Sequence, residues 1–559
     1  GAQVAYHEAK KEDPTRSLTR LMLTPLTHRN LLWSALLAAS VALLILLFAG
    51  LLAQMRPVSM HDLHLGAGEK LKCVSYAPYH RPGQTPLDPD TRIEREQIAA
   101  DLAALAEITR CVRLYSVSQG LEHVPELARP LGLQVLLGAW IGYDVSANAA
   151  ELERAITLAN DNADVVRALI VGNEVLLRRE RTPAEMQALI RDAKARTQVP
   201  VTYADVWEFW TRHDELAAEV DFVTVHILPF WEDEPVDIDH ALTHVADIRR
   251  QVGIHFGTKP VLIGETGWPS AGRQREQSRP SLVNQARYIR EFVHQAQQEG
   301  WDYNIIEAID QPWKRRLEGT VGGHWGLLEA GSLHPKFALA GAVAERESLF
   351  GPIGGALLGG LIACLLAATG RRTRCLRVSA LTACGAVGGV ISVLHWEHAH
   401  LAYRDALEWS VLGGIAALAG LLPLVLARWH GEPIPDTASA ARSLWRAERM
   451  RSKAPSVGLL RGLFLFAAAV AALLLWVDPR YRDFPTWLYL APALVFGVIG
   501  WWRSRITIAE RTCAAVIVIG VIARWLSEPA NPQAIAWLSC GLALAVPVLA
   551  LRSHEHQQG

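Results

Sequence analysis

The stretch LIGETGWPS, from Leu262 to Ser270, carries one ionisable side chain, Glu265. The apolar approach to it, 260–263, predicts a buried strand, and the Gly-Trp-Pro sequence behind it predicts a turn. A carboxylate is therefore expected at the carboxyl end of a strand. Parallel α/β barrels hold their catalytic groups at that end, because the loops there converge on one open mouth.

A second apolar run ends in the same way. The sequence LIVGNE, from Leu169 to Glu174, stops on a glutamate that Asn173 directly precedes. Either glutamate alone is also consistent with a solvated strand end. Two of them in one repeating α/β region predict a carboxylate pair that faces a shared cleft. Such a pair performs glycoside chemistry: one group attacks or stabilises the anomeric carbon, and the other transfers the leaving-group proton.

From Leu71 onward, apolar strands alternate with amphipathic helices, a pattern typical of βαβ units and a parallel sheet. Eight strands are predicted, the number that a (β/α)8 TIM barrel needs, with the two glutamates on the fourth and seventh. The predicted strands are KCVSYAPY (72–79), CVRLYS (111–116), QVLLGAWI (134–141), LIVGNE (169–174), VTYADVW (201–207), FVTVHILPF (222–230), PVLIGETGWP (260–269) and YNIIEAIDQPW (303–313). The predicted helices include Thr91–Glu107, Ala149–Asn162, Thr182–Arg196, Asp237–Val252 and Leu282–Gln298.

The motifs GETGWPS and VGNE resemble two signatures of glycoside hydrolase family 17, the β-1,3-glucanases and related transglycosylases. The resemblance covers about Leu71 to Glu347, within a barrel domain expected at 66–347. It implies that Glu265 is the nucleophile and Glu174 the acid/base of a retaining pair, roughly 5 to 5.5 Å apart, that forms a covalent glycosyl-enzyme. A general acid must keep its proton near neutral pH. We therefore expect burial or the other carboxylate to raise the pKa of Glu174.

Aromatic and polar residues at strand ends are the expected contacts to sugar, because the apolar faces of sugar rings pack on indole rings. Asn173 is expected to bind the sugar's 2-hydroxyl, although a simple strand-end hydrogen bond is the alternative. The expected substrate-binding residues are Asn173, Tyr76, Tyr115, Trp140, Trp207, His226, Trp268, Glu307 and Trp313, with Trp210, Trp231, Trp325, Phe230 and Gln311 as further candidates. No cofactor or metal is expected. The sequence HWEHAH, 395–400, does not have a zinc-ligand spacing and is expected in a surface loop.

Seven cysteines follow no metal-binding pattern, and only Cys73 and Cys111 fall in the barrel region. They lie in consecutive predicted strands. A disulfide is conceivable in an oxidising compartment. We nevertheless predict two free buried thiols, because neighbouring parallel strands seldom offer disulfide geometry.

The rest of the chain is strongly apolar. After a basic tail, 1–30, the run 31–53 predicts an uncleaved membrane anchor. A domain of seven further spans is expected at 352–551, followed by a tail at 552–559. The expected spans are 352–369, 378–395, 406–427, 459–477, 486–502, 506–526 and 534–551.

Connector charge predicts the orientation of these spans. Basic connectors at 371–374, 428–453 and 503–505 alternate with weakly charged or mixed ones at 397–405, 478–483 and 527–533. The positive-inside bias then places both termini in the cytoplasm and the barrel outside. The near-zero net charge, from 55 basic and 56 acidic residues, gives no indication of a nucleic-acid partner.

The resemblance implies a glucanosyltransferase that branches or cyclises periplasmic β-glucan at a bacterial inner membrane. Membrane-tethered bacterial members of the family resemble a module that accompanies β-glucan synthases, and an enzyme anchored beside seven spans suits modification of an emerging product. The alternatives are an endo-β-1,3-glucanase and a non-catalytic barrel that binds or conducts glucan. The partners expected are β-glucan, the lipid bilayer and a separate β-glucan synthase. The synthase is expected on another chain because the connector 428–459 is far too short for a glycosyltransferase domain.

Overall fold

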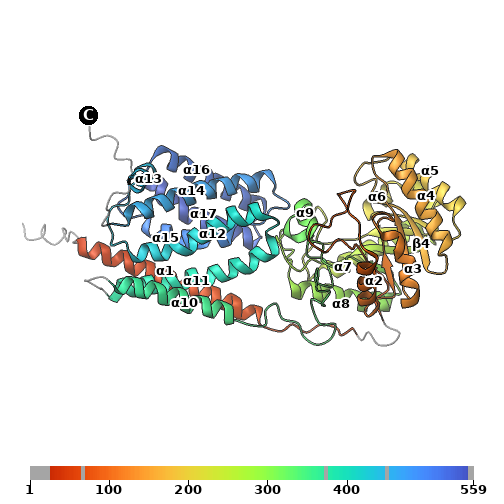
Figure 1. Ribbon diagram of the computed structural model, residues 1–559, viewed down its shortest axis with the longest axis horizontal. Coiled ribbons are helices and arrows are strands. Elements are labelled where there is room, and N and C mark those ends of the chain that lie inside the picture. The colour runs from red at the N-terminus through yellow and green to blue at the C-terminus, as the bar shows by residue number, and fades with distance from the viewer. Residues whose placement is uncertain (1–24, 64–69, 370–374, 447–451, 552–559) are drawn as a thin grey trace, which may run out of the picture.

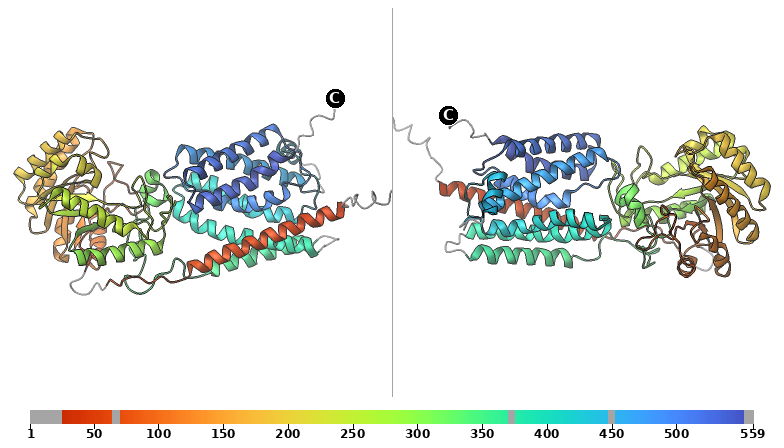
Figure 2. Two further views of the ribbon diagram at one scale, coloured as in Figure 1. Left: turned by 180° about the vertical axis from the view of Figure 1, so that it is seen from behind. Right: turned by 45° about the horizontal axis from the view of Figure 1, so that its top comes forward.

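The computed structural model describes residues 25–63, 70–369, 375–446 and 452–551. A barrel and a helical bundle lie end to end along the long axis of the molecule (Figure 1, Figure 2). The tails predicted at 1–30 and 552–559 lie outside the described residues, except that residues 25–30 begin the first helix.

Eight parallel strands close into a barrel in the order β1-β2-β3-β4-β5-β6-β7-β8, which confirms the predicted TIM-barrel fold. Each strand pairs with its sequence neighbour, and β1 closes the ring on β8 through Val74 and Ile305. Glu174 directly follows β4, and Glu265 lies within β7 near its end, as predicted. The strands are β1 (Val74–Ser75), β2 (Cys111–Arg113), β3 (Gln134–Ala139), β4 (Val166–Asn173), β5 (Val201–Val206), β6 (Val223–His226), β7 (Val261–Thr266) and β8 (Asp302–Ile305).

The five predicted helices are present around the barrel with shifted ends, and three short helices were not predicted. Thr182 begins one of them with a capping box: its hydroxyl accepts from the Glu185 backbone, and Pro183 occupies the first turn. The helices of the barrel are α2 (Arg95–Ala106), α3 (Val124–Ala128), α4 (Val145–Asp161), α5 (Pro183–Arg196), α6 (Trp207–Arg212), α7 (Ala241–Phe256), α8 (Leu282–Glu299) and α9 (Arg315–Gly322).

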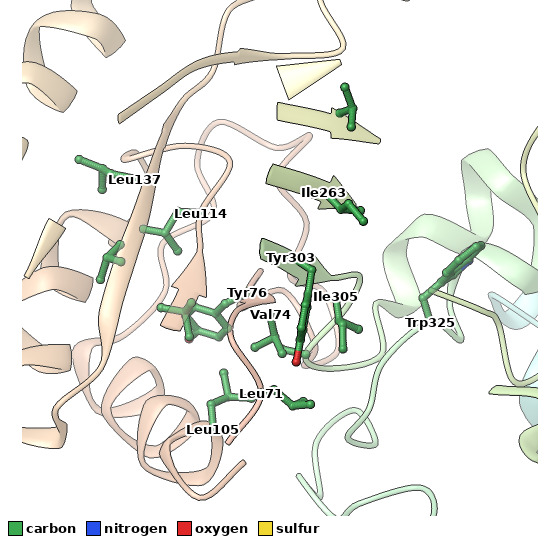
Figure 3. Close-up of a cluster of buried hydrophobic side chains, with 14 of the residues drawn as sticks. Leu71, Val74, Tyr76, Leu105, Leu114, Leu137, Ile263, Tyr303, Ile305 and Trp325 are labelled. Atoms are coloured by element: carbon green, nitrogen blue, oxygen red, sulfur yellow. The ribbon is translucent and has the colours of Figure 1, made fainter. Parts of the chain in front are cut away.

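Alternation along the strands separates two cores. Outward side chains such as Val74, Leu114 and Ile263 pack between the strands and the surrounding helices (Figure 3). A smaller cluster that includes Leu136, Ala168 and Leu262 fills the inside of the barrel. Because alternate residues of a strand point to opposite faces, side chains that flank these outward positions are directed towards the barrel axis and the mouth.

Cys73 and Cys111 form a disulfide, so the prediction of two free thiols is wrong. Their neighbours Val74 and Val112 are paired in register, which places the two cysteines opposite each other inside the barrel. Their Cα atoms are 4.4 Å apart, at the short end of the range that a disulfide can bridge. Disulfides between neighbouring parallel strands are rare, but the direct register of β1 and β2 brings these two cysteines close enough to bond.

The helical bundle contains α1 and the seven helices expected between 352 and 551. Six helices in the described part of the chain, α1, α10, α11, α12, α14 and α17, are long and apolar enough to cross a membrane. Helix α15 has only 14 residues, and α16 carries three charged side chains. The bundle consists of α1 (Pro25–Gln54), α10 (Phe350–Ala368), α11 (Cys375–Ala402), α12 (Ala406–Ala427), α13 (Thr437–Trp445), α14 (Ala454–Val477), α15 (Thr486–Ile499), α16 (Ile508–Ser527) and α17 (Pro532–Ala550).

The HWEHAH sequence lies in the last turns of α11, not in the surface loop that we expected. The helix continues to Ala402 and buries His395 and Ala399. His395 contacts the hydroxyl of Tyr403 at 3.0 Å, so this end of the helix packs against the residues that follow it.

Three connectors of the bundle contact the barrel. At the α11–α12 connector, Arg315 of α9 donates to the carbonyl of Leu401 in the last turn of α11 at 2.9 Å and to that of Tyr403 in the connector at 3.4 Å. In the α14–α15 connector, Asp483 accepts from Thr320 at 2.5 Å. In the α16–α17 connector, Glu528 forms a buried ion pair with Arg273. The barrel residues of these three contacts lie in segments that follow β7 or β8, and Arg480 of the α14–α15 connector also donates to the carbonyl of Trp231, which follows β6. Helix α9 lies between the barrel and the bundle (Figure 1).

Candidate active site

Glu174 and Glu265 share one site at the barrel mouth. One carboxylate oxygen of each lies within 4.8 Å of the other and of a nitrogen of His226. The Glu265 side chain is 6% exposed, whereas that of Glu174 is 23% exposed. The two acidic groups are 91 positions apart in the chain and lie in one site, as we expected from the sequence. Glu265 is the more deeply buried of the two.

Local backbone geometry directs Glu174 into the site. Gly172 has φ +85°, a region that favours glycine, and a Cβ there would lie 2.7 Å from a methyl carbon of Val175. Glu174 itself has φ +52°, an uncommon conformation for a residue with a side chain. Its backbone N–H donates to Ala204 of β5 at 2.8 Å, so the turn remains attached to the next strand.

Arg113, at the end of β2, fixes Glu265. Its guanidinium donates to Oε1 of Glu265 at 3.1 Å, and to the side-chain oxygen of Asn173 at 2.5 Å. The hydroxyl of Tyr115 donates to the same carboxylate oxygen at 2.8 Å. Arg113 and Tyr115 alternate with outward-facing Leu114, so one face of a short strand supplies both donors. These contacts fix the orientation of the Glu265 carboxylate, which a nucleophile requires.

His226, at the end of β6, bridges the two carboxylates. Its Nδ1 lies 2.9 Å from Oε1 of Glu174, and its Nε2 lies 3.7 Å from Oε1 of Glu265. The ring fits because residue 264 is glycine: a Cβ there would lie 3.1 Å from a ring carbon of His226 and 2.5 Å from a methyl carbon of Thr224. A larger residue at 264 would displace the imidazole from between the glutamates.

The pKa of Glu174 is lowered in this arrangement, although we expected it to be raised. Burial acts to raise this pKa. The hydrogen bond and charge of His226, together with the charges of Arg178 and Arg113, act to lower it and outweigh burial. The expectation was wrong because it considered burial and the second carboxylate, and not a basic partner. The same contact makes Glu174 and His226 a hydrogen-bonded pair.

A second group of ionisable residues lies beside the pair, on the segment after β8. Burial raises the pKa of Glu307 to about 7, while the charge of Lys314, 2.7 Å away, acts in the opposite direction. Burial likewise raises the pKa of Glu318 in α9; Lys314 opposes this effect, and the charges of Glu174 and Glu265 add to it. Glu307 was predicted, whereas Lys314 and Glu318 were not.

Most of the predicted sugar-binding residues lie at or around the barrel mouth. Asn173, Tyr115 and His226 lie at the carboxylates, and Trp140 lies nearby on the open side, 41% exposed, with Arg178 stacked over its ring at 4.4 Å. Trp313 donates its indole N–H to Gln311, and Trp207 is half-buried against the barrel core. Sugar contacts for these residues remain a prediction.

Tyr76 and Trp268 do not reach the mouth, which corrects two of the predicted contacts. Tyr76 is 1% exposed and donates to Asp101 of α2 at 2.8 Å, so it lies in the outer wall (Figure 3). Trp268 is fully buried against Tyr288 of α8, and its indole N–H donates to the carbonyl of Arg279. Tyr76 points outward because alternation gives the inward position to Ser75. In β7 the register with β6 shifts between Ile263 and Glu265, and Trp268 comes three residues after Glu265.

Sequence reasoning missed Arg113 altogether, although a signal was present. It ends a three-residue strand, between Val112 and Leu114, on the inward face, where a cation needs a buried counter-charge.

Glu174, His226 and Glu265 also have the spacing of metal ligands. The Arg113 guanidinium on Glu265 opposes that interpretation, because it places a fixed positive charge where the cation would bind.

Known proteins resemble the barrel region. Residues 73–326 match the family model described as the BtgE/BtgC glycoside hydrolase domain. Relatives include a probable glucan endo-1,3-beta-glucosidase btgC of Aspergillus fumigatus, 26% identical over 266 residues, which are 42% of this chain and 38% of that protein. The chain thus spans well under half the length of this relative. A glucan 1,3-beta-glucosidase of Saccharomyces cerevisiae is 25% identical over 257 residues, which are 41% of this chain and 80% of that protein.

Among solved structures, a glycoside hydrolase family 17 beta-1,3-glucanosyltransferase from Rhizomucor miehei is 26% identical to this chain. It covers 48% of this chain and 97% of its own, with a TM-score of 0.43.

Proposed function

We propose that the protein is a retaining glucanosyltransferase that acts on β-1,3-glucan. The match of residues 73–326 to the BtgE/BtgC glycoside hydrolase domain supports this proposal. The observation that carries this proposal is the pair of carboxylates within 4.8 Å. That separation suits direct attack on the sugar, whereas inverting pairs stand about 6.5 to 9.5 Å apart to admit a water.

In the proposed first step, Glu265 attacks the anomeric carbon and Glu174 delivers a proton to the departing sugar oxygen. Arg113 and Tyr115 hold Glu265 in its attacking orientation, and His226 fixes the position of Glu174. A covalent glucosyl ester on Glu265 results. In the second step, Glu174 takes a proton from the hydroxyl of an incoming sugar, which displaces Glu265 and forms the new linkage.

Hydrolysis differs only in the second step, where water replaces the sugar hydroxyl. The printed names of the fungal relatives, which are glucosidases, favour this second candidate. The seating of the barrel on a helical bundle supports transfer instead, because an enzyme fixed there is suited to modify a polymer as it emerges. Incubation of the full chain with laminarihexaose decides between them by mass spectrometry. Products longer than the donor indicate transfer, and shorter products alone indicate hydrolysis.

The roles of the two glutamates can be separated with two substrates. Dinitrophenyl β-laminaribioside carries a leaving group that needs no proton, whereas laminarihexaose carries one that does. Glu174→Gln should therefore retain release of dinitrophenol while losing about 10²- to 10⁴-fold on laminarihexaose, whereas Glu265→Gln should lose both. Glu232→Gln is the matched control, because Glu232 also contacts a histidine, His244, at 2.8 Å but lies outside the pair. Turnover of either substrate by Glu265→Gln would refute the nucleophile.

We also propose that the bundle spans a bacterial inner membrane eight times, with the barrel in the periplasm. The bundle connectors that contact the barrel are the three that charge bias assigns to the outer side. A disulfide within the barrel supports an oxidising compartment. Protease added to spheroplasts should cut the barrel and spare the bundle; protection of the barrel would reject this topology.

A separate β-glucan synthase is the proposed partner and β-glucan the proposed substrate. The described connector with α13 is a single short helix, with no room for a nucleotide-sugar enzyme. Affinity purification of the full chain from its native membranes should recover a glycosyltransferase. A purification that recovers none would contradict the partnership while leaving the barrel chemistry unaffected.

A further inference from the structure

The bundle contains a pocket that the barrel chemistry does not use. It has a volume of about 380 Å³, in the range of small-molecule sites, and lies between α11, α12 and α15. Aromatic residues line it where α11 ends and where α12 and α15 begin: Trp396, Tyr403, Trp409 and Trp487. Further along the same helices the lining changes to small residues, including Gly388, Gly413 and Gly420.

This change of lining gives the pocket two chemically distinct parts. Trp409 stacks edge-on against both Trp396 and Tyr403, at 5.7 and 5.2 Å, so the rings form one aromatic wall. Indole faces bind the C–H faces of sugars and prefer the membrane–water boundary. Glycine and alanine leave a mainly apolar channel between the helices, which accommodates a hydrocarbon chain. The hydroxyl of Ser392, which also lines the pocket, donates to the carbonyl of Gly388.

One ring nitrogen of His395, a residue that lines the pocket, has no hydrogen-bond partner among the described residues. His395 is 7% exposed, lines the pocket, and uses Nε2 for the hydroxyl of Tyr403. Its other ring nitrogen, Nδ1, is buried and has no hydrogen-bond partner among the described residues. A buried polar atom of this kind is costly unless a ligand satisfies it. A pure hydrocarbon cannot do so, whereas a sugar hydroxyl can.

The pocket lies next to the barrel mouth. The carbonyl of Tyr403, one of the lining residues, accepts from Arg315 at 3.4 Å. Arg315 directly follows Lys314, which pairs with Glu307 beside the candidate catalytic carboxylates. A ligand whose head sits at the aromatic wall is therefore held beside the segment that borders the cleft.

We propose that this pocket binds a glycolipid, with a sugar ring on the aromatic wall and an acyl chain in the glycine-lined channel. The choice of a glucose head rests on the proposed glucan activity. The lipid anchors a sugar at the membrane surface beside the barrel mouth, as a primer or an acceptor for the glucan.

Two adjacent glycines provide the test. A Cβ added at Gly413 or at Gly414 meets no atom within 4 Å, so neither position resists a larger side chain, but only Gly413 lines the pocket. The full chain, purified in detergent, is incubated with monoglucosyl-diacylglycerol or with diacylglycerol of the same chains. Native mass spectrometry then measures the bound lipid.

The wild type and Gly414→Leu should retain the glucosyl lipid, and Gly413→Leu should retain at least about ten-fold less. His395→Ala should lose the preference for the glucosylated lipid. Equal retention by the two leucine variants, or equal retention of both lipids by the wild type, overturns the proposal. Glu265→Gln separates this result from the barrel chemistry: it should bind the lipid normally while it loses turnover of laminarihexaose.

Discussion

Nδ1 of His226 lies 2.9 Å from Oε1 of Glu174, and this contact governs when the proposed acid is protonated. Burial acts to raise the pKa of Glu174, but His226, by hydrogen bond and charge, is the largest of the influences that lower it. A carboxyl with a lowered pKa loses its proton at a lower pH than usual. The proposed reaction should therefore slow as pH rises through the acidic range.

His226→Ala tests this dependence. The substitution removes the hydrogen bond and the charge that favour the carboxylate, while burial, which favours the neutral acid, remains. The pKa of Glu174 should rise, and the basic limb of the kcat/KM profile should move to higher pH. His244→Ala, which breaks a similar contact with Glu232, should leave the profile in place. An unshifted limb in His226→Ala would contradict Glu174 as the group that titrates there.

Arg113 should contribute to both stability and turnover. Its guanidinium is 1% exposed and serves Glu265 and Asn173 together. Arg113→Met leaves a buried carboxylate without its cation, at a cost of about 3 to 5 kcal/mol. Arg113→Lys keeps the charge but cannot donate to both partners in the same fixed geometry. We expect kcat to fall about 100-fold in the lysine variant with a smaller change in KM.

Thermal unfolding and steady-state kinetics of the full chain measure these effects. Arg129→Met is the matched control, because Arg129 pairs with Asp164 on the surface of the barrel. It should leave both the melting temperature and kcat unchanged. A melting temperature of Arg113→Met that equals the wild type would show that the buried pair is dispensable.

The fold and the two glutamates could be predicted from sequence because both depend on local patterns. In LIGETGWPS and LIVGNE, an apolar run followed by a glutamate marks the carboxyl end of a strand. The alternation of strands with helices predicts a parallel ring. Arg113 and Lys314 were not predicted, because their importance depends on which strand ends and loops meet across the barrel. The prediction for Tyr76 was wrong because strand alternation places its ring on the outer face, opposite to Ser75. The prediction for Trp268 was wrong because the register shift in β7 cannot be seen in the sequence.

The disulfide provides a stability prediction. Cys73 and Cys111 close a loop with a sequence separation of 38. Chain-entropy reasoning assigns such a loop about 4 kcal/mol of stabilisation. Replacing both cysteines with serine should lower the melting temperature of the full chain, and reductant should lower that of the wild type to a similar value. Insensitivity of the wild type to reductant at high temperature would argue against the bond.

Contact between α9 and the α14–α15 connector should support turnover. Gly319 has φ +70°, and a Cβ there would collide with the carbonyl of Tyr481. Gly319→Ala should therefore push α9 away from the bundle and disturb Glu318 and Lys314 beside the cleft. We expect kcat/KM on laminarihexaose to fall about ten-fold or more, since small displacements at a catalytic site cost rate steeply.

Gly331→Ala separates this collision from simple backbone strain. Gly331 also has a positive φ, +78°, but a Cβ there meets no atom within 4 Å. Both variants should lose stability because alanine is strained at positive φ in either place, and Gly319→Ala should lose more because of the collision. Only Gly319→Ala should lose turnover. Equal activity of the two variants would show that the barrel works independently of its contact with the bundle, whereas a selective loss would make the bundle part of the machinery that shapes the cleft.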